Sequence, residues 1–327
     1  MPALALVTII RNEARFLPAF LAYYRALGVE RAYVYLDRCT DESLTILQRH
    51  AWVEALACDQ DPGANQLVLH QMQCAKDALA RARAGEFDWL LLVDVDEFAW
   101  GGDTLPPARP WWRKASRAQA LLRQGSLTGL VARVGSEIEM IILHTAEVVP
   151  EPSSVGKPFW SLSHFQVDRV LGRPVLDPTT GQVRRLERWL GHRLGKSLVR
   201  TRADVQPFDS HVWTRNQRAL VPEEQPLNAV VQGWLLHYVV TDGRHWWRKY
   251  RQLAYESSRW LRGQPVEFPK QAWKEASQTM DESAATAYFD RWVAVSRIRR
   301  WIACARGGIR RVTAVGEIMA HLGLKEG

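Results

Sequence analysis

The chain has 327 residues, of which 47% are apolar and 24% are charged, and its formal net charge is +8. This composition excludes an intrinsically disordered protein, and no apolar run approaches the roughly 18 to 20 residues that a membrane-spanning helix requires. The length predicts one large domain with an appendage, or two smaller domains.

The first apolar segment, residues 4–10, is short and rich in β-branched side chains, which predicts a buried parallel strand. It lacks the basic start and the small-residue cleavage site of a signal peptide. A helix is expected to open at Asn12 and Glu13, because apolar residues recur at helical spacing up to Leu27, and Gly28 stands at the C-cap position.

Strands and helices continue to alternate along the first hundred residues. The expected segments are a strand at 31–36, a helix at 42–50, a strand at 53–57, a loop at 59–64, a helix at 66–84 and a strand at 89–93. Such alternation favours an α/β fold with a mostly parallel sheet, in which ligands bind beyond the carboxyl ends of the strands. Asp37 and Asp94 both stand at such ends.

Beyond residue 97 the pattern becomes irregular. Residues 100–114 hold glycines, prolines and tryptophans and predict a loop that forms a lid or an acceptor wall. Further strands are expected at 127–134, 138–143 and 197–201, and helices at 246–261 and 283–304. We therefore expect a catalytic domain at 1–240 and a helical, basic region at 241–327, which holds 16 Lys and Arg against nine Asp and Glu.

Asp94 and Asp96 follow the most apolar strand candidate of the chain. Two carboxylates at a strand end suit Mn²⁺ or Mg²⁺, with substrate phosphates and water completing the coordination. Such an ion neutralises charge on a departing diphosphate. The alternative is an acidic turn that caps the next helix, since a bare D-x-D pattern also occurs by chance.

Three blocks of sequence together resemble a known group of enzymes. They are residues 7–13 (VTIIRNE), residues 33–43 (YVYLDRCTDES) and residues 91–98 (LLVDVDEF). In order and spacing they are similar to the blocks of GT-A-fold glycosyltransferases, and more narrowly to the bacterial family-2-like group related to family 92. Residues 195–200 with His211, and residues 236–239 with Lys249, extend the resemblance, which is patchy after the first hundred residues and says little beyond Arg251.

The resemblance implies a GT-A, Rossmann-like sheet flanked by helices, and it assigns roles to individual residues. The implied nucleotide-sugar contacts are Thr8, Arg11, Asn12, Glu13, Asp37, Gln71, Asp94 and Lys196, and the implied metal ligands are Asp94, Asp96 and His237. Structural alternatives exist for several of them: charge complementarity at a helix start for Glu13, a turn for Asp37, an exposed helix position for Gln71, a surface group for Lys196 and a core histidine for His237.

An inverting transfer also needs a general base near the acceptor hydroxyl. Glu137, Asp209 and His211 are the candidates, and the resemblance favours Glu137 and His211, although Glu137 replaces the small residue usual in the family's Gly-Ser block. A retaining mechanism would not need such a base, so the stereochemical course stays open at this point.

The tail from Arg297 to Arg306 interleaves arginines with apolar side chains, a pattern typical of helices on anionic membranes. The alternative, which we favour from sequence, is a basic helix whose Ile298, Trp301 and Ile302 pack onto the main domain. Four cysteines without metal-binding or disulfide spacing indicate reduced thiols and a cytoplasmic protein, with peripheral contact to the inner face of the membrane as an extension.

The sequence thus predicts a metal-dependent glycosyltransferase that moves a sugar from a nucleoside diphosphate sugar, with UDP favoured, to a hydroxyl of a glycan or lipid-linked acceptor. We expect the transfer to invert the anomeric configuration and to serve the synthesis of bacterial cell-surface polysaccharide. We expect no nucleic acid partner. A nucleotidyltransferase is disfavoured, because residues 11–13 contain no glycine-rich phosphate loop. A catalytically silent protein that binds an acidic glycan or nucleic acid through the basic tail is the remaining alternative.

Overall fold

The computed structural model describes residues 1–58, 67–108, 117–167, 173–178, 180–186, 195–208, 211, 213–215, 227–253 and 269–324. Its strands are β1 (Leu4–Ile10), β2 (Arg31–Leu36), β3 (Val53–Ala57), β4 (Trp89–Leu92), β5 (Glu97–Trp100), β6 (Met140–Val148), β7 (His164–Gln166), β8 (Arg173–Leu176), β9 (Val183–Leu186), β10 (Ser197–Arg200), β11 (Gln206–Pro207), β12 (Trp213–Thr214), β13 (Ala229–His237) and β14 (Ile309–Arg311). Its helices are α1 (Leu17–Ala26), α2 (Ser43–Leu47), α3 (Leu67–Ala84), α4 (Ala118–Gly125), α5 (Leu127–Arg133), α6 (Gly243–Leu253), α7 (Lys270–Thr279), α8 (Glu282–Tyr288), α9 (Arg297–Ala305) and α10 (Ala314–His321), with a 3₁₀ turn η1 (Phe159–Ser161) and a π-helix η3 (Phe289–Val293).

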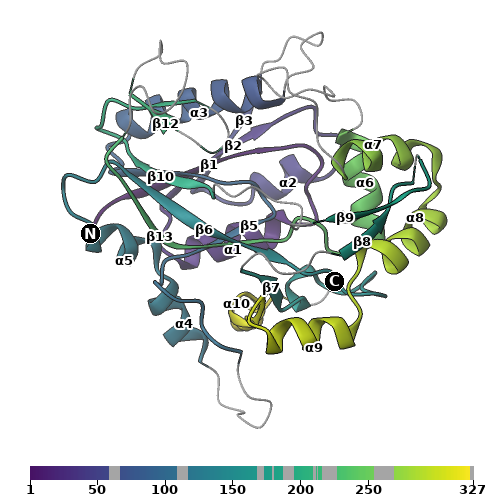
Figure 1. The fold of residues 1–327 in the computed structure, drawn as a ribbon. Coiled ribbons are helices and arrows are strands. Elements are labelled where there is room, and N and C mark those ends of the chain that lie inside the picture. Colours follow the sequence, from purple (N-terminus) through teal and green to yellow (C-terminus); the bar gives the residue numbers. More distant parts are fainter. Residues whose placement is uncertain are drawn as a thin grey trace.

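A ten-stranded mixed sheet forms the centre of the molecule, in the order β14-β7-β6-β10-β4-β1-β2-β3 (Figure 1). Strands β4, β1, β2 and β3 pair in parallel, as the alternating pattern predicts, whereas β10 runs antiparallel between β4 and β6. Strand β13 joins through β6 and carries β5 on its other side. The predicted α/β fold with flanking helices and a helical C-terminal extension is confirmed.

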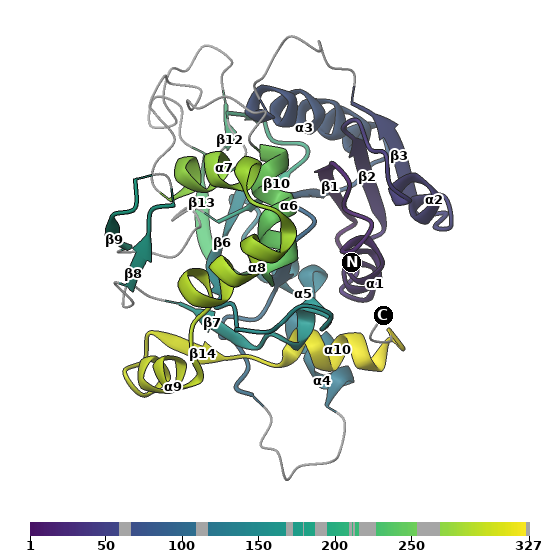
Figure 2. The ribbon, with the colours of Figure 1, turned by 90° about the vertical axis from the view of Figure 1, so that its right-hand side faces the viewer.

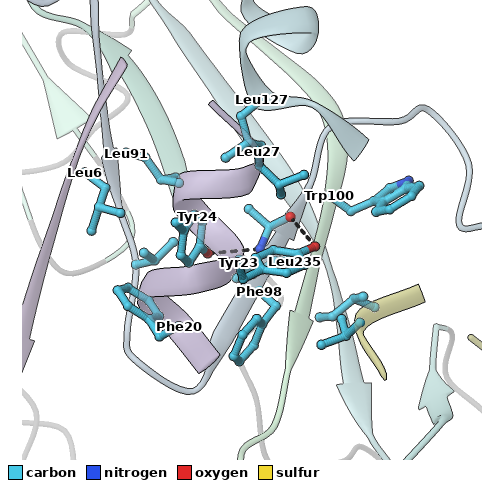
Figure 3. Packing of buried hydrophobic residues seen from close by; sticks show 14 of the residues in the cluster. Leu6, Phe20, Tyr23, Tyr24, Leu27, Leu91, Phe98, Trp100, Leu127 and Leu235 are labelled. Carbon is cyan, nitrogen blue, oxygen red and sulfur yellow. Dashed lines mark hydrogen bonds between the residues drawn. The ribbon is translucent and has the colours of Figure 1, made fainter. Parts of the chain in front are cut away.

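Helix α1 forms because Leu17, Phe20, Leu21 and Tyr24 recur at helical spacing and bury one face against the sheet. Its tyrosines also hold strand β5 in place (Figure 3). The Tyr23 hydroxyl donates to the carbonyl of Ala99 at 2.9 Å, and the Ala99 amide donates to the Tyr24 hydroxyl at 3.0 Å. These bonds fix the strand that begins at Glu97, directly after the two aspartates.

The expected strand at residues 127–134 is wrong, since Leu127–Arg133 is helix α5. The Ser126 side chain accepts a hydrogen bond from the Gly129 amide and caps the helix. Leu127, Leu130 and Val131 are buried, which is the three- and four-residue spacing of a helix face. Short apolar runs are ambiguous between strand and helix, and here the cap decides.

The single helix expected at 283–304 is interrupted. Helix α8 passes into the π-helix η3, the chain is extended at Ala294 and Ser296, and α9 begins at Arg297. The Val295 amide donates to the carbonyl of Pro150 at 2.9 Å, and Val293 and Val295 are both buried. Burying these two side chains against another part of the chain takes precedence over continuing the helix.

The C-terminal region packs against the rest of the molecule at several places (Figure 2). Strand β14 pairs antiparallel with β7 and so extends the main sheet. Helix α10 packs on α1 and α4, and its Val315 and Ile318 belong to the same buried cluster as Leu4 and Leu6 of β1. Among the residues that the structure describes, no helix has the length and hydrophobicity needed to cross a membrane.

Candidate active site

A cavity of about 820 Å³ opens at the carboxyl ends of the parallel strands. The segments that follow β1, β2 and β4 reach it, as do the end of β13 and one face of α6. The predicted site residues that line it are Arg11, Asn12, Glu13, Asp37, Gln71, Asp94, Asp96, His211 and His237. Phe16, Phe159 and Trp160 form an aromatic part of the wall.

Asp94 meets Lys196 because β10 runs antiparallel to β4. The register sets Leu198 opposite Leu91, so Lys196, just before β10, comes opposite Val93, the residue that precedes Asp94. The Lys196 ammonium lies 3.1 Å from Asp94 Oδ2, and its side chain is buried, whereas that of Asp94 is 38% exposed. Lys196 is thus no surface group, and it holds a positive charge against the more open carboxylate.

Asp96 meets His237 because the end of β13 pairs with the start of β5, with His237 opposite Glu97. His237 Nε2 lies 3.7 Å from Asp96 Oδ2, and His237 Nδ1 lies 3.6 Å from Glu147 Oε1. Lys249 of α6 donates to the same Asp96 oxygen at 2.6 Å and to the carbonyl of Val239 at 3.0 Å. Asp96 is therefore enclosed by two cationic side chains.

These contacts decide which groups are charged. Burial opposes ionisation of Asp96, but Lys249 and His237 outweigh it and hold the pKa of Asp96 well below its usual value. Burial likewise disfavours the charged form of His237, yet Asp96 raises the pKa of His237 to about 10. The pKa of Lys249 also lies above its ordinary value, since the attraction of Asp96 exceeds the effect of burial. At neutral pH the centre is an ionised carboxylate between two cations.

Two glutamates beside this centre behave differently. Burial, reinforced by the charge of Asp96, raises the pKa of Glu13 to about 8. Burial also raises the pKa of Glu97 to about 7, and Glu97 Oε2 accepts the backbone amide of Asp94 at 2.7 Å. Both carboxyl groups thus change protonation near neutral pH, so the cavity holds residues able to exchange protons with a ligand.

Asp37 is engaged by two arginines. Arg11 Nε donates to Asp37 Oδ2 at 2.7 Å, the Arg11 guanidinium makes a second bond to that oxygen, and Arg38 Nε donates to Oδ1 at 2.9 Å. Asp37 is almost fully buried. The residue predicted to contact the base or ribose therefore also orients Arg11 at the wall of the cavity.

Of the other residues predicted to contact the nucleotide sugar, some lie on the wall of the cavity and one lies behind it. Asn12 has a positive φ of 57°, and its Oδ1 accepts the amide of Thr40 at 2.7 Å, so it joins the segment after β1 to the segment after β2 beside the cavity. Thr8 is fully buried within β1 and does not line the cavity. Gln71 reaches the wall from the half-buried side of α3.

The two predicted catalytic residues lie in different places. His211 lines the cavity, and its carbonyl accepts the Ser197 hydroxyl at 3.1 Å. Glu137 is exposed outside the cavity, where its carbonyl accepts the Asn228 side-chain amide at 2.9 Å. Asp209 lies outside the described residues. Of the two candidate bases that the structure describes, His211 lines the cavity that Asp94 and Asp96 also line, and Glu137 does not.

The side chains of Asp94, Asp96 and His237 supply two carboxylates and an imidazole, a donor set that fits Mn²⁺ chemically. Each carboxylate is paired with a lysine, and His237 carries a proton in this arrangement. Over the described ranges, no group of three or more His, Cys, Asp or Glu side chains already surrounds a common point. A cation would therefore have to displace these partners.

Lys249, Glu97 and Glu147 had no predicted role, although all three contribute to the centre. Glu97 was visible as part of the acidic block after β4, and Lys249 as part of the last block of the resemblance. Glu147 carries no local signal, because its position at the end of β6 depends on the pairing of β6 with β13.

Comparisons with known proteins gave few and partial similarities. No family profile matches the chain. A segment of 105 residues is 29% identical to a glycosyltransferase family 92 protein of Ricinus communis. The matched segment covers 29% of this chain and 16% of that protein.

Among solved structures, a mycobacterial protein is 13% identical with a TM-score of 0.36, covering 78% of this chain and 73% of that one. Glucosyl-3-phosphoglycerate synthase from Mycobacterium tuberculosis, in complex with Mn²⁺, UDP and glucosyl-3-phosphoglycerate, is 13% identical with a TM-score of 0.29, covering 61% and 57%.

Proposed function

We propose that the chain is a glycosyltransferase that moves a sugar from a nucleoside diphosphate sugar to a hydroxyl group of a glycan or lipid-linked acceptor. The observation that carries the proposal is the meeting of Asp94 and Asp96 with Arg11 and Asp37 in one cavity at the ends of parallel strands. The partial similarity to a family 92 glycosyltransferase supports the same reaction class.

The donor would bind with its nucleotide toward β1 and β2. There the guanidinium of Arg11, which Asp37 holds in position, could contact the nucleotide. The residues that follow β1 and β2 line the same part of the cavity. The diphosphate would lie toward Lys196 and Lys249, whose ammonium groups are already fixed by Asp94 and Asp96. We favour UDP among the common nucleotides.

Asp94, Asp96 and His237 would hold Mn²⁺ or Mg²⁺. When bound, such an ion supplies positive charge to the departing diphosphate. The chain's own lysines act in the same sense, because Lys249 on the cavity wall and Lys196, buried beside Asp94, bring two further positive charges close to it. His237 can ligate a metal only after losing the proton that it carries beside Asp96.

The acceptor would approach from the aromatic wall of Phe16, Phe159 and Trp160. Apolar and aromatic linings with a few polar groups are typical of small-molecule sites. For an inverting transfer, His211 would accept the proton of the attacking hydroxyl, since it is a described candidate base that lines the cavity. We place the reaction in the cytoplasm, at the inner face of the membrane, and in the synthesis of cell-surface polysaccharide.

Calorimetry with UDP, GDP and dTDP, with and without Mn²⁺, tests the donor site. We expect metal-enhanced binding of one nucleotide, and a loss of at least tenfold in affinity in Asp96→Asn. Asp204→Asn is the matched control, because Asp204 is exposed and lies outside the cavity. Conversion of the matching sugar nucleotide by the native chain, followed by NMR of the product anomer, then tests inversion.

The calorimetry also distinguishes the transferase from a binding protein without catalytic activity. Absence of nucleotide binding under every condition would refute the transferase. Binding that is equally tight without divalent metal would instead favour the catalytically silent binding protein, or a transferase that uses Lys196 and Lys249 in place of an ion.

A further inference from the structure

Helix α9 turns its apolar side chains toward solvent. Ile298 and Trp301 are each 72% exposed, and Ile302 is 38% exposed. Successive positions on an α-helix are about 100° apart, so Trp301, Ala305, Ile298 and Ile302 form one continuous stripe. We call these four residues the α9 stripe. The sequence-based preference for packing them onto the main domain is therefore wrong.

The polar side of α9 is the one that anchors it. Arg300 is buried, donates to the carbonyl of Val295 at 2.5 Å and lies 3.1 Å from Glu151 Oε2. Ala303, one turn along the same side, is fully buried. Because these contacts fix the rotation of the helix, the α9 stripe must face outward.

Positive charge surrounds the stripe. Arg297 and Arg306 flank it at its two edges on the helix, and Arg299, Arg310 and Arg311 are also exposed. Sequence positions between Asp290 and Glu317 hold no acidic residue. Within the part of the chain that the structure describes, none of these five guanidinium groups forms an ion pair. The surface thus combines an uncovered tryptophan with uncompensated cations.

We propose that the α9 stripe and the arginines of the same helix, Arg297, Arg299 and Arg306, bind the surface of an anionic lipid bilayer. Interfacial helices show this combination, in which apolar side chains enter the boundary of the acyl chains and arginines contact the lipid phosphates. A second copy of the chain is a poorer occupant, since pairing two stripes would bring two sets of arginines together. Figures 1 and 2 place α9 on the outside of the molecule, at the end opposite α3.

This inference names the surface that would bring the chain to the membrane where we place the reaction, but it does not depend on the reaction itself, because it concerns a surface away from the cavity. None of the four stripe residues lines the cavity. Lipid binding and nucleotide binding can therefore be measured separately, and either one can fail while the other succeeds.

The test is co-sedimentation of the full chain with vesicles of phosphatidylglycerol and phosphatidylcholine, compared with vesicles of phosphatidylcholine alone. We expect binding to the anionic vesicles that weakens when salt rises from about 0.1 M to 1 M, because the Debye length falls from about 10 to 3 Å. The double variant Ile298→Ser/Trp301→Ser should lose at least tenfold in partition coefficient. Arg297→Gln/Arg299→Gln should lose about fivefold per charge.

The matched control is Leu44→Ser/Arg49→Gln, which removes one exposed apolar and one exposed cationic side chain near α2. It should bind vesicles like the native chain. Equal binding to neutral vesicles, no binding to any vesicle, or unchanged binding by both α9 variants would each overturn the proposal. A native dimer in sedimentation velocity that Trp301→Ser separates, without vesicle binding, would also overturn it and identify a second copy as the partner.

Discussion

Removing Lys249 should show that Asp96 depends on its cationic partners. The side chain of Asp96 is 9% exposed and that of Lys249 is 25% exposed, and their charged atoms lie 2.6 Å apart. Breaking a buried ion pair costs roughly 3 to 5 kcal/mol, because one charge stays buried without compensation. His237, at 3.7 Å, still compensates Asp96 in part. We therefore expect Lys249→Met to lower the free energy of unfolding by about 2 to 3 kcal/mol, somewhat below that range.

A double-mutant cycle separates this effect from simple loss of packing. Asp96→Asn alone should also cost about 2 kcal/mol, since it leaves Lys249 beside a neutral amide. The double variant Lys249→Met/Asp96→Asn should cost less than the sum of the two, with a coupling of at least about 2 kcal/mol. The measurement is urea unfolding followed by circular dichroism, in EDTA so that no metal replaces the lost charge.

The exposed pair of Arg244 and Glu282 is the matched control. Its side chains are 50% and 38% exposed at 2.5 Å, so its coupling should stay below about 1 kcal/mol. If the costs of Lys249→Met and Asp96→Asn add to within about 0.5 kcal/mol, the two side chains do not compensate each other and the described charge balance is wrong.

Three further predictions concern stability. The pKa of His237, about 10, and that of Glu13, about 8, lie above the ordinary values of 6.5 and 4.5, so the folded chain binds extra protons. Stability in EDTA should therefore fall as pH rises from 6.5 to 9, and His237→Gln should flatten that slope in thermal unfolding. Gly195→Ala should cost at least about 2 kcal/mol in urea unfolding, because its Cβ would lie 1.8 Å from the carbonyl of Leu143. Ser126→Ala should cost about 1 kcal/mol in the same assay, as it removes the cap of α5; no loss would show that the cap is dispensable.

The parallel half of the sheet could be predicted from sequence because each strand there is buried on both faces. Such strands appear as continuous apolar runs, and those at 31–36 and 53–57 agree with β2 and β3 to the residue. The rule that parallel strands end at one edge then brings Arg11, Asp37 and Asp94 to a common place, as the cavity confirms.

The residues that pair with Asp94 and Asp96 were harder to predict from the sequence. Lys196 reaches Asp94 because β10 inserts antiparallel beside β4, more than a hundred residues away in sequence. Lys249 reaches Asp96 from a helix beyond β13. No local pattern encodes these pairings, since they depend on the order of strands in the second half of the sheet. For that reason Lys249 received no role from sequence, although it is one of the two cations that hold the pKa of Asp96 below its usual value.

Helix α9 shows why an amphipathic pattern alone does not say which face packs. Burying the apolar stripe would be favourable by the hydrophobic effect, and that expectation guided the sequence-based interpretation. Arg300, however, finds Glu151 and the carbonyl of Val295, and these interactions are available to that side of the helix only. A buried guanidinium without such partners would be costly, whereas exposed Ile298 and Trp301 can be covered by another surface. The polar contacts therefore set the rotation of α9, and the stripe is left for a partner outside the chain.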